Sequence, residues 1–221
     1  DALPGFAVAG YTIANSDYAV SNTTTLVLLL VESGGNDTQA TPVVTYDRDV
    51  TGGKTAADNA GNEVPDGDDV TPTDGAGPAI TDVDAPADGT YIVGQNLDFT
   101  VTWHEAVTVA SGTPFLQIDI GGVTKNATLN SGAGTQRVFR YTVVEGDLDL
   151  TGGIAFVSTQ IQLGGATIRD AANNNAAVEF AANAPSLTNV LVDGVSPTMT
   201  SAVTEDNDGN GQIDRITVTF D

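Results

Sequence analysis

The residues best suited to chemistry are oxygen-bearing side chains in an acidic stretch near the end of the chain. Residues 205–221 read EDNDGNGQIDRITVTFD, with oxygen atoms on alternate side chains. Calcium takes about six to eight hard oxygen ligands from a flexible loop, and this spacing curls the oxygens around one point. The stretch therefore predicts a calcium site whose ligands are Asp206, Asp208, Asn210, the main-chain carbonyl of Gln212, and Asp214.

The acidic stretch differs from the helix-flanked calcium loop in two ways. Position 12, counted from Asp206, is Thr217 instead of a bidentate Glu, and the residues that follow alternate as in a strand. The closer comparison is the DxDxDGxxD loop of β-hairpins, with Asn210 in place of the third Asp. We expect a structural ion bound with a Kd on the order of 10⁻⁴ to 10⁻³ M. The alternative is a solvated acidic turn, because Asp, Asn and Gly are the usual turn residues.

The rest of the sequence offers little catalytic chemistry. His104, the one histidine, follows Trp103, so strand alternation predicts a buried Trp103 and a solvent-facing His104. Cysteine is absent, which excludes thiol catalysis, and no nucleophile-elbow, zinc-protease or phosphate-loop motif occurs. The chain is therefore predicted not to be an enzyme. Two further acidic groups are expected to be solvated faces: Glu145, Asp147 and Asp149, and Asp82 with Asp84.

The charge of the chain narrows its partners. The 221 residues include 29 acidic and 7 basic ones, for a net charge of -22, and 40% are hydrophobic. This balance predicts a globular chain that repels phosphate backbones and anionic lipid and attracts cations. Because of this repulsion we expect no nucleic acid binding. No stretch reaches the roughly 18 apolar residues that a membrane-spanning helix needs, so we expect no membrane insertion either. The chain begins at Asp1, from which we expect a processed chain or a piece of a longer one.

The elements that position the acidic stretch are predicted to be β-strands. Val, Ile, Thr and aromatic residues alternate with polar ones between turns of Gly, Asn, Asp and Pro, and no stretch has a convincing helical period. The predicted fold class is therefore all-β, with Ig-like β-sandwich domains in tandem. The clearest alternating stretches are residues 97–103 (LDFTVTW), 115–120 (FLQIDI), 137–144 (RVFRYTVV) and 214–220 (DRITVTF).

Weak internal repeats organise these strands. The central part of the chain has four motifs in the order FTVTW, YTVVEGD, DAANN and DGVSP. The beginning of the chain has counterparts of the last three motifs, and the end has a counterpart of the first, which indicates a repeated unit. The matched pairs are residues 99–103 with 216–220, 141–147 with 28–34, 170–174 with 58–62, and 193–197 with 74–78.

The two ends of the chain match the central unit when they are placed in succession. TVTFD from the end followed by DAL from the beginning parallels TVTWHEAV of residues 100–107 without a gap. One sandwich is therefore predicted to be complete, and another to be split between the two ends. The predicted domains are residues 1–77, which lack the first strand or strands, residues 78–196, which are complete, and residues 197–221, a hairpin that completes the 1–77 type of domain in the next copy or subunit.

Two arrangements would join the pieces, and both make copies of the chain its own partners. Either the 221 residues are one period of a covalent tandem array, or separate subunits donate the C-terminal strand to one another. The gapless match favours the covalent array. Both arrangements are head-to-tail and do not close, so both produce filaments or stalks.

Four stretches of the central unit carry a family resemblance: PAITDVDAPADGTYIVGQNLDFTVTWHEAVTV (residues 78–109), FRYTVVEGD (139–147), ATIRDAANN (166–174) and VLVDGVSPT (190–198). They resemble the bacterial Ig-like repeats of large surface adhesins and S-layer-type proteins. Residues 196–221 and 1–75 are similar to a second, related repeat type. The resemblance implies an extracellular or cell-surface location, a spacer or adhesive role, and stiffening by calcium. The DAANNN turn departs from the family, where Gly is usual, but Asn tolerates left-handed backbone conformations.

These observations together predict a non-enzymatic extracellular structural repeat protein that forms a filament, stalk or surface layer and is stiffened by calcium. One alternative is an adhesin or carbohydrate-binding surface module with a glycan or protein ligand. Another is an accessory region of a larger secreted enzyme. A sugar-binding face would need exposed aromatic rings, and the chain has 6% aromatic residues and a single Trp, which is expected to be buried.

Overall fold

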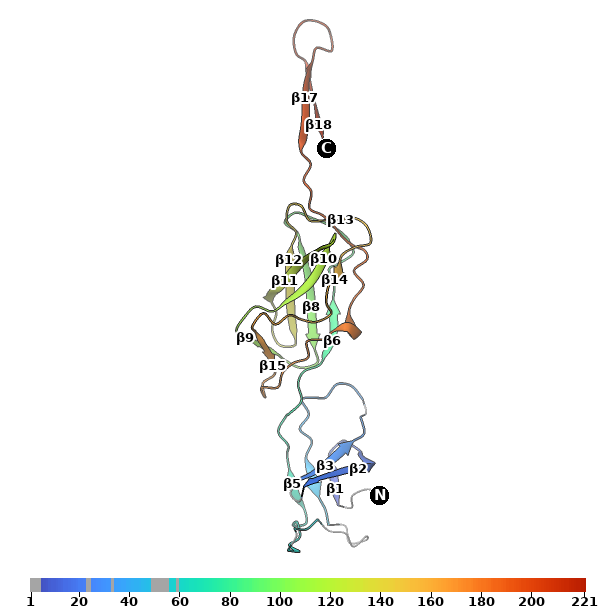
Figure 1. Ribbon diagram of the computed structural model, residues 1–221, viewed down its shortest axis with the longest axis vertical. Helices are drawn as coiled ribbons and strands as arrows, with labels where there is room; N and C mark the ends of the chain where they lie inside the picture. The colour runs from blue at the N-terminus through green and yellow to red at the C-terminus, as the bar shows by residue number, and fades with distance from the viewer. Residues whose placement is uncertain (1–4, 23–24, 33, 49–55, 59) are drawn as a thin grey trace. The chain divides into compact units, whose positions relative to one another are not determined.

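The computed structural model describes residues 5–22, 25–32, 34–48, 56–58 and 60–221. Over these ranges the chain consists of β-strands, turns and loops, with one helical element, the 3-10 helix η1 (Ala181–Asn183). This confirms the predicted all-β class, and the several sheets are consistent with a β-sandwich (Figure 1). The chain divides into two compact units: residues 1–79 with 169–176 (unit 1), and residues 80–168 with 177–221 (unit 2).

Unit 1 contains a three-stranded sheet of order β1-β4-β5 and a separate hairpin, β2–β3. Its buried apolar residues among those described are Val8, Tyr46, Pro78 and Ala176, and the ring of Tyr46 lies 4.9 Å from that of Phe6, centroid to centroid. The strands are β1 (Phe6–Val8), β2 (Ile13–Asn22), β3 (Thr25–Leu30), β4 (Val44–Tyr46) and β5 (Asp68–Val70).

Unit 2 is built on a six-stranded sheet of order β14-β10-β11-β12-β8-β6. A three-stranded sheet, β13-β16-β7, includes a parallel pair of β16 with β7, and β15–β9 and β17–β18 are two-stranded. The strands are β6 (Ile80–Asp84), β7 (Gly89–Ile92), β8 (Asn96–Trp103), β9 (Thr108–Ala110), β10 (Phe115–Ile120), β11 (Val123–Ser131), β12 (Gln136–Thr142), β13 (Leu148–Asp149), β14 (Ala155–Phe156), β15 (Thr167–Arg169), β16 (Val190–Asp193), β17 (Met199–Glu205) and β18 (Arg215–Phe220).

Strand alternation builds the core of unit 2. In β8 every second side chain is buried, ending with Trp103, which is 1% exposed. Its Nε1 donates a hydrogen bond to the carbonyl oxygen of Ala177 at 2.9 Å, so the polar atom of the ring is satisfied. The rings of Phe99, Phe156 and Phe180 follow one another at centroid separations of 5.4 and 5.1 Å. The prediction that Trp103 is buried in the central unit is confirmed.

The β6–β8 pair contains a one-residue bulge. Ile80 pairs with Trp103 and Asp82 with Thr102, so the intervening Thr81 has no opposite residue. A bulge of this kind bends the strand and increases its twist, so its position characterises a strand pair.

The β17–β18 hairpin has the same bulge in the same place. Met199 pairs with Phe220 and Ser201 with Thr219, so Thr200 is the extra residue. Counted from the bulge, Phe220 stands where β8 has its last residue. The likeness between ITVTF and FTVTW in sequence therefore extends to the pairing of their backbones.

A second pair of hairpins is matched in the same way, beginning with β11–β12. Leu129 pairs with Phe139 and Ser131 with Val138, which leaves Asn130 as the extra residue. The bulge lies on the first strand of the hairpin, close to the turn that leads into β12.

The β2–β3 hairpin of unit 1 repeats that irregularity. Val20 pairs with Leu26 and Asn22 with Thr25, which leaves Ser21 as the extra residue. Counted from the bulge, Leu26 of β3 therefore stands where β12 has its buried phenylalanine. This agrees with the sequence parallel between LLLVESG and YTVVEGD, which aligns β3 with β12 independently.

The repeated DAANN and DNAGN motifs share the hydrogen bonds between their first and last residues, while Asn59 of the second motif lies outside the described residues. In turn 170–174 the Asp carboxylate accepts hydrogen bonds from the main-chain and side-chain nitrogens of the final Asn, at 2.8 and 2.9 Å. In turn 58–62 the two equivalent bonds are both 2.8 Å. Gly61 has a φ of 88°, and its counterpart Asn173 has a φ of 77°. Asn173 thus adopts the left-handed conformation in which Gly is the usual residue.

Truncating the central tryptophan tests the core of unit 2. Trp103→Ala is expected to lower the free energy of unfolding by about 3–5 kcal/mol, because it leaves a cavity and an unpaired Ala177 carbonyl. Urea denaturation followed by circular dichroism measures the change. Val123→Ala, at an exposed position of β11, is the matched control and is expected to change stability by no more than about 0.5 kcal/mol. A loss for Trp103→Ala as small as that of the control would contradict a buried anchor.

Candidate metal centre

The acidic stretch forms the loop that joins β17 to β18. At the base of the loop, Glu205 and Arg215 are opposite one another in the pairing, and the Arg215 guanidinium donates to the Glu205 carboxylate. The Thr217 hydroxyl donates to the same carboxylate at 3.2 Å, and the main-chain nitrogen of Asp214 donates to the Glu205 carbonyl at 3.1 Å. These contacts hold the two ends of the loop together.

The loop brings three of the five predicted ligands together. One carboxylate oxygen from each of Asp206, Asp208 and Asp214 lies within 4.8 Å of the others. All three residues are exposed. Three anionic oxygens around one point are a ligand set for a hard cation such as calcium or magnesium, since these ions prefer oxygen over nitrogen or sulfur.

Main-chain N–H groups hold all three carboxylates in place, and Asp208 accepts a hydrogen bond from the nitrogen of Asn210 at 3.1 Å. Asp206 accepts hydrogen bonds from the nitrogens of Asn210, at 3.1 Å, and Gly211, at 2.7 Å. Asp214 accepts one from the nitrogen of Asn207 at 2.9 Å. The bond from Gly211 is the main reason that the pKa of Asp206 lies below its ordinary value, because N–H donors favour the charged carboxylate. A φ of 84° at Gly211 lets the backbone turn back toward Asp206.

The other two predicted ligands, Asn210 and Gln212, lie in a turn beside the carboxylates. The side-chain oxygen of Asn210 accepts a hydrogen bond from the main-chain nitrogen of Gln212 at 2.9 Å. The side-chain nitrogen of Asn210 donates to Asp208 at 2.8 Å. Asn210 therefore helps to orient one carboxylate of the cluster.

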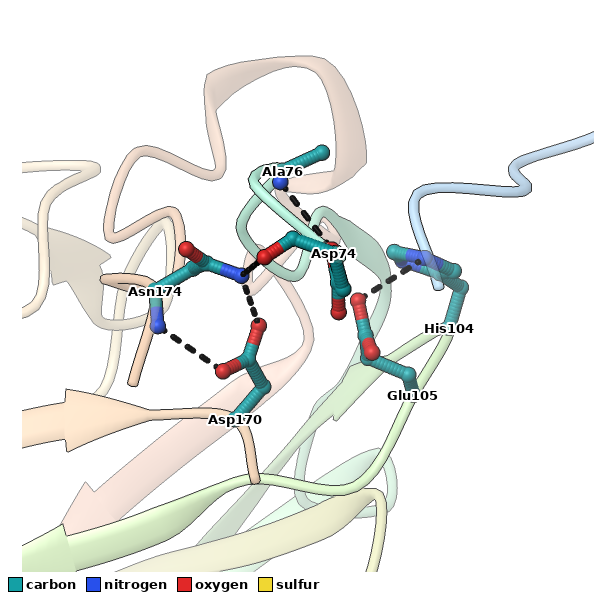
Figure 2. Close-up of polar contacts among 6 residues, drawn as sticks. All are labelled: Asp74, Ala76, His104, Glu105, Asp170 and Asn174. Atoms are coloured by element: carbon teal, nitrogen blue, oxygen red, sulfur yellow. Dashed lines mark hydrogen bonds and ion pairs between the residues drawn. The ribbon is translucent and has the colours of Figure 1, made fainter. Parts of the chain in front are cut away.

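The DAANN turn contains a buried carboxylate, Asp170, that holds part of unit 1 together by hydrogen bonds. The sequence identifies this turn only as a repeated motif. Asp170 is buried and takes both hydrogen bonds of Asn174 described above (Figure 2). Asn174 also donates to the main-chain carbonyl of Asp74 at 3.4 Å, and the Asp74 side chain accepts from the nitrogen of Ala76 at 3.0 Å. The turn thereby fastens the DGAGP linker of the same unit.

The expectation that His104 faces solvent is wrong. Its side chain is 7% exposed, and its Nε2 lies 3.3 Å from a carboxylate oxygen of Glu105, which is buried to the same degree (Figure 2). Strand β8 ends at Trp103, so the alternation that would turn the next side chain outward stops one residue too early.

The expectation of a solvated acidic face at Glu145, Asp147 and Asp149 is also wrong for its central member. Asp147 is 3% exposed and lies 2.7 Å from the Nζ of Lys125. It accepts further hydrogen bonds from the Tyr141 hydroxyl at 2.7 Å and the Val144 nitrogen at 2.9 Å. Burial opposes its ionisation, but these donors outweigh it and lower the pKa of Asp147.

The flanking carboxylates serve separate polar contacts. Glu145 accepts hydrogen bonds from the nitrogen and hydroxyl of Ser196, at 3.0 and 2.7 Å, and Asp149 accepts one from the nitrogen of Gly121 at 3.0 Å. Asp82 and Asp84, by contrast, are exposed as predicted. The number of charges along the sequence does not distinguish the buried Asp147 from the exposed Asp82 and Asp84, since the cation that pairs with Asp147 is Lys125 of β11, which is distant in the sequence.

Comparison with known proteins adds no relative: no family model, no curated protein and no solved structure matches this chain. Over the described residues, no helix is long and apolar enough to cross a membrane.

Removing the buried carboxylate charge tests the Lys125–Asp147 pair. Asp147→Asn is expected to lower the free energy of unfolding at neutral pH by on the order of 2 kcal/mol, because Lys125 loses its counter-ion. The folded pKa of Asp147 is depressed, so its contribution is complete above the ordinary pKa of 3.8 and is lost as the pH falls through the folded value. Urea unfolding of both chains, from neutral to strongly acidic pH, should show the difference closing.

The matched control for this variant is Glu179→Gln, at an exposed carboxylate, with an expected change of at most about 0.5 kcal/mol. A stability difference between Asp147→Asn and the parent chain that stayed constant down to strongly acidic pH would contradict the ionised pair.

Proposed function

We propose that this chain is a non-enzymatic extracellular structural protein whose β-sandwich units continue head to tail from one copy to the next. The observation that carries the proposal is the β17–β18 hairpin, which has the strand pairing of β6–β8 but an uncovered apolar face. The acidic composition and the resemblance of residues 78–197 to repeats of bacterial surface proteins support the extracellular assignment.

The two faces of the β17–β18 hairpin differ in chemistry. Residues directly opposite one another in an antiparallel pair have their side chains on the same side. The apolar face, so defined, consists of Met199, Ala202, Thr204, Ile216, Val218 and Phe220, and the polar face of Ser201, Val203, Glu205, Arg215, Thr217 and Thr219.

The apolar face is exposed where its counterpart in unit 2 is core. Phe99 and Trp103 are 0% and 1% exposed, whereas Ile216 and Phe220, at the same distances from the bulge, are 61% and 56% exposed. Burying such side chains stabilises a structure by about 1.5–3 kcal/mol each. A hairpin with this face is therefore suited to complete a sandwich whose other strands lie elsewhere.

A second copy of the chain is the partner that the repeat order supports. A hairpin added to the open sandwich of another copy makes a heterologous interface, and repeated addition makes a filament. The same geometry arises whether the copies follow one another in a covalent array or exchange strands as separate chains. Each copy has a net charge of -22, so their contact must overcome repulsion.

Calcium in the β17–β18 loop would reduce that repulsion and stiffen the hairpin. The three clustered carboxylates, Asp206, Asp208 and Asp214, are the residues that would hold the ion. The ion has no chemical step to perform in this proposal, since its role is to neutralise the loop and fix the hairpin that enters the neighbouring sandwich.

A calcium titration followed by NMR tests the loop. We expect the amide signal of Gly211 to shift with a Kd on the order of 10⁻⁴ to 10⁻³ M, because calcium draws on the carboxylate to which this amide donates. Asp208→Asn should weaken binding at least about tenfold by removing one anionic ligand. Asp82→Asn removes an equal charge at an exposed position away from the loop and should leave the titration unchanged. An amide signal that does not move at millimolar calcium would exclude the site.

Sedimentation velocity over a concentration series tests head-to-tail association. The parent chain, of 22.5 kDa, is expected to form species at multiples of this mass, and Val218→Asp should abolish them by placing a charge on the apolar face. Thr219→Asp is the matched control, since it adds the same charge one residue away on the polar face. A monomer at every concentration, or equal effects of the two substitutions, would refute the proposal.

A further inference from the structure

We infer that strand β18 of one copy pairs antiparallel with strand β3 of the next copy, with Ile216 opposite Leu26. The inference rests on the proposed head-to-tail continuation and goes beyond it by naming the strand that receives the hairpin and the register of the pairing. In unit 2 the equivalent pairing is present, between β8 and β12. The counterparts of these two strands, β18 and β3, belong to separate two-stranded sheets.

The equivalent pairing is the junction of β8 with β12. In the six-stranded sheet, β12 has β11 on one side and β8 on the other, so the bulged hairpin β11–β12 and the bulged strand pair β6–β8 join where β12 meets β8. Phe99 of β8 is directly opposite Phe139 of β12, and both are fully buried.

The separate counterparts are the hairpins β2–β3 and β17–β18. The positions of their bulges align β2–β3 with β11–β12 and β17–β18 with β6–β8, as described above. Within the described part of the chain, β3 and β18 each have a single neighbouring strand. Each therefore has one edge whose main-chain groups can accept another strand, in the way that exposed sheet edges generally do.

The register follows from the two alignments. Leu26 holds the place of Phe139, and Ile216 holds the place of Phe99, so these two side chains meet on the core face. Leu26 is 36% exposed, and it would be covered together with Ile216. On the opposite face Arg215 would lie across from uncharged Val27, which leaves Arg215 free to keep its contact with the carboxylate of its own hairpin.

The order of the strands along the chain indicates that the β3 strand that pairs with β18 belongs to a second copy of the chain. In unit 2 the β6–β8 hairpin precedes β11–β12 in sequence, whereas β17–β18 follows β2–β3. The order found in unit 2 is restored when the hairpin of one copy is placed before the β2–β3 hairpin of another. A pairing of β18 with β3 of its own chain would reverse that order.

Disulfide trapping between two single-cysteine chains tests the register. The natural chain has no cysteine, so an Ile216→Cys chain mixed with a Leu26→Cys chain has one thiol per chain and forms the mixed disulfide efficiently only where the two positions meet. Opposite residues in an antiparallel pair have Cα atoms about 4.5–5.5 Å apart, which is within disulfide reach. We expect a mixed disulfide dimer under mild oxidation, identified by peptide mapping, at least about tenfold more abundant than with the control.

The matched control is Val27→Cys mixed with Ile216→Cys, since Val27 neighbours Leu26 but faces the other side of the sheet. Arg215→Cys mixed with Val27→Cys is a second pair of opposite positions in the same register, on the other face of the sheet. This pair tests the register if the Leu26→Cys chain does not fold. Equal trapping at the two positions of β3 would overturn the register.

Sedimentation of the parent chain separates this inference from the proposed function. Association of the parent chain without the mixed disulfide in either in-register pair would overturn the β18–β3 pairing and leave head-to-tail assembly standing. Absence of both association and trapping would overturn the two together.

Discussion

A two-stranded β-hairpin cannot bury its apolar face by itself, and isolated hairpins are at best marginally stable in water. The described part of the chain contains two such two-stranded pairs, β2–β3 and β17–β18, and also a six-stranded sheet in which matching strand pairs are joined and covered. The difference is one of completeness, since a one-residue bulge recurs at matching positions in both settings, although β2–β3 has a further register shift between Ile13 and Tyr18. The exposed apolar face of β17–β18 follows from this constraint.

Carboxylates are compensated differently in the buried parts of the structure and in the exposed β17–β18 hairpin. In unit 2, buried Asp147, which immediately precedes β13, is neutralised by Lys125 of β11, and in the DAANN turn Asp170 is satisfied by the nitrogens of Asn174. In the open hairpin the acidic side chains gather in one loop, where main-chain N–H groups orient them but no basic side chain of the loop opposes them. A chain with so few basic residues must compensate its remaining carboxylates with solvent or with cations.

Much of this architecture could be predicted from sequence, because it depends on local pattern. Period-two alternation identified the strands and the buried Trp103, and the repeated motifs pointed to the turns that prove equivalent in structure. Features that depend on where a strand ends, or on partners distant in the chain, were missed. The solvent-facing assignment of His104 failed because the strand ends one residue earlier, and Asp147 was misjudged because Lys125 comes from another strand. The bulges, which reveal the match between the hairpins, have no sequence signature strong enough to be read in advance.

The scarcity of basic residues has a consequence for the resistance of the protein to proteolysis. Proteases that cleave after Lys or Arg need an extended, accessible substrate segment, and most of these residues lie within paired strands. Cleavage there must wait for the sheet to open, so the rate of digestion would report the stability of the sheet and not the number of sites. The basic residues in described strands are Lys125 in β11, Arg137 and Arg140 in β12, Arg169 in β15 and Arg215 in β18.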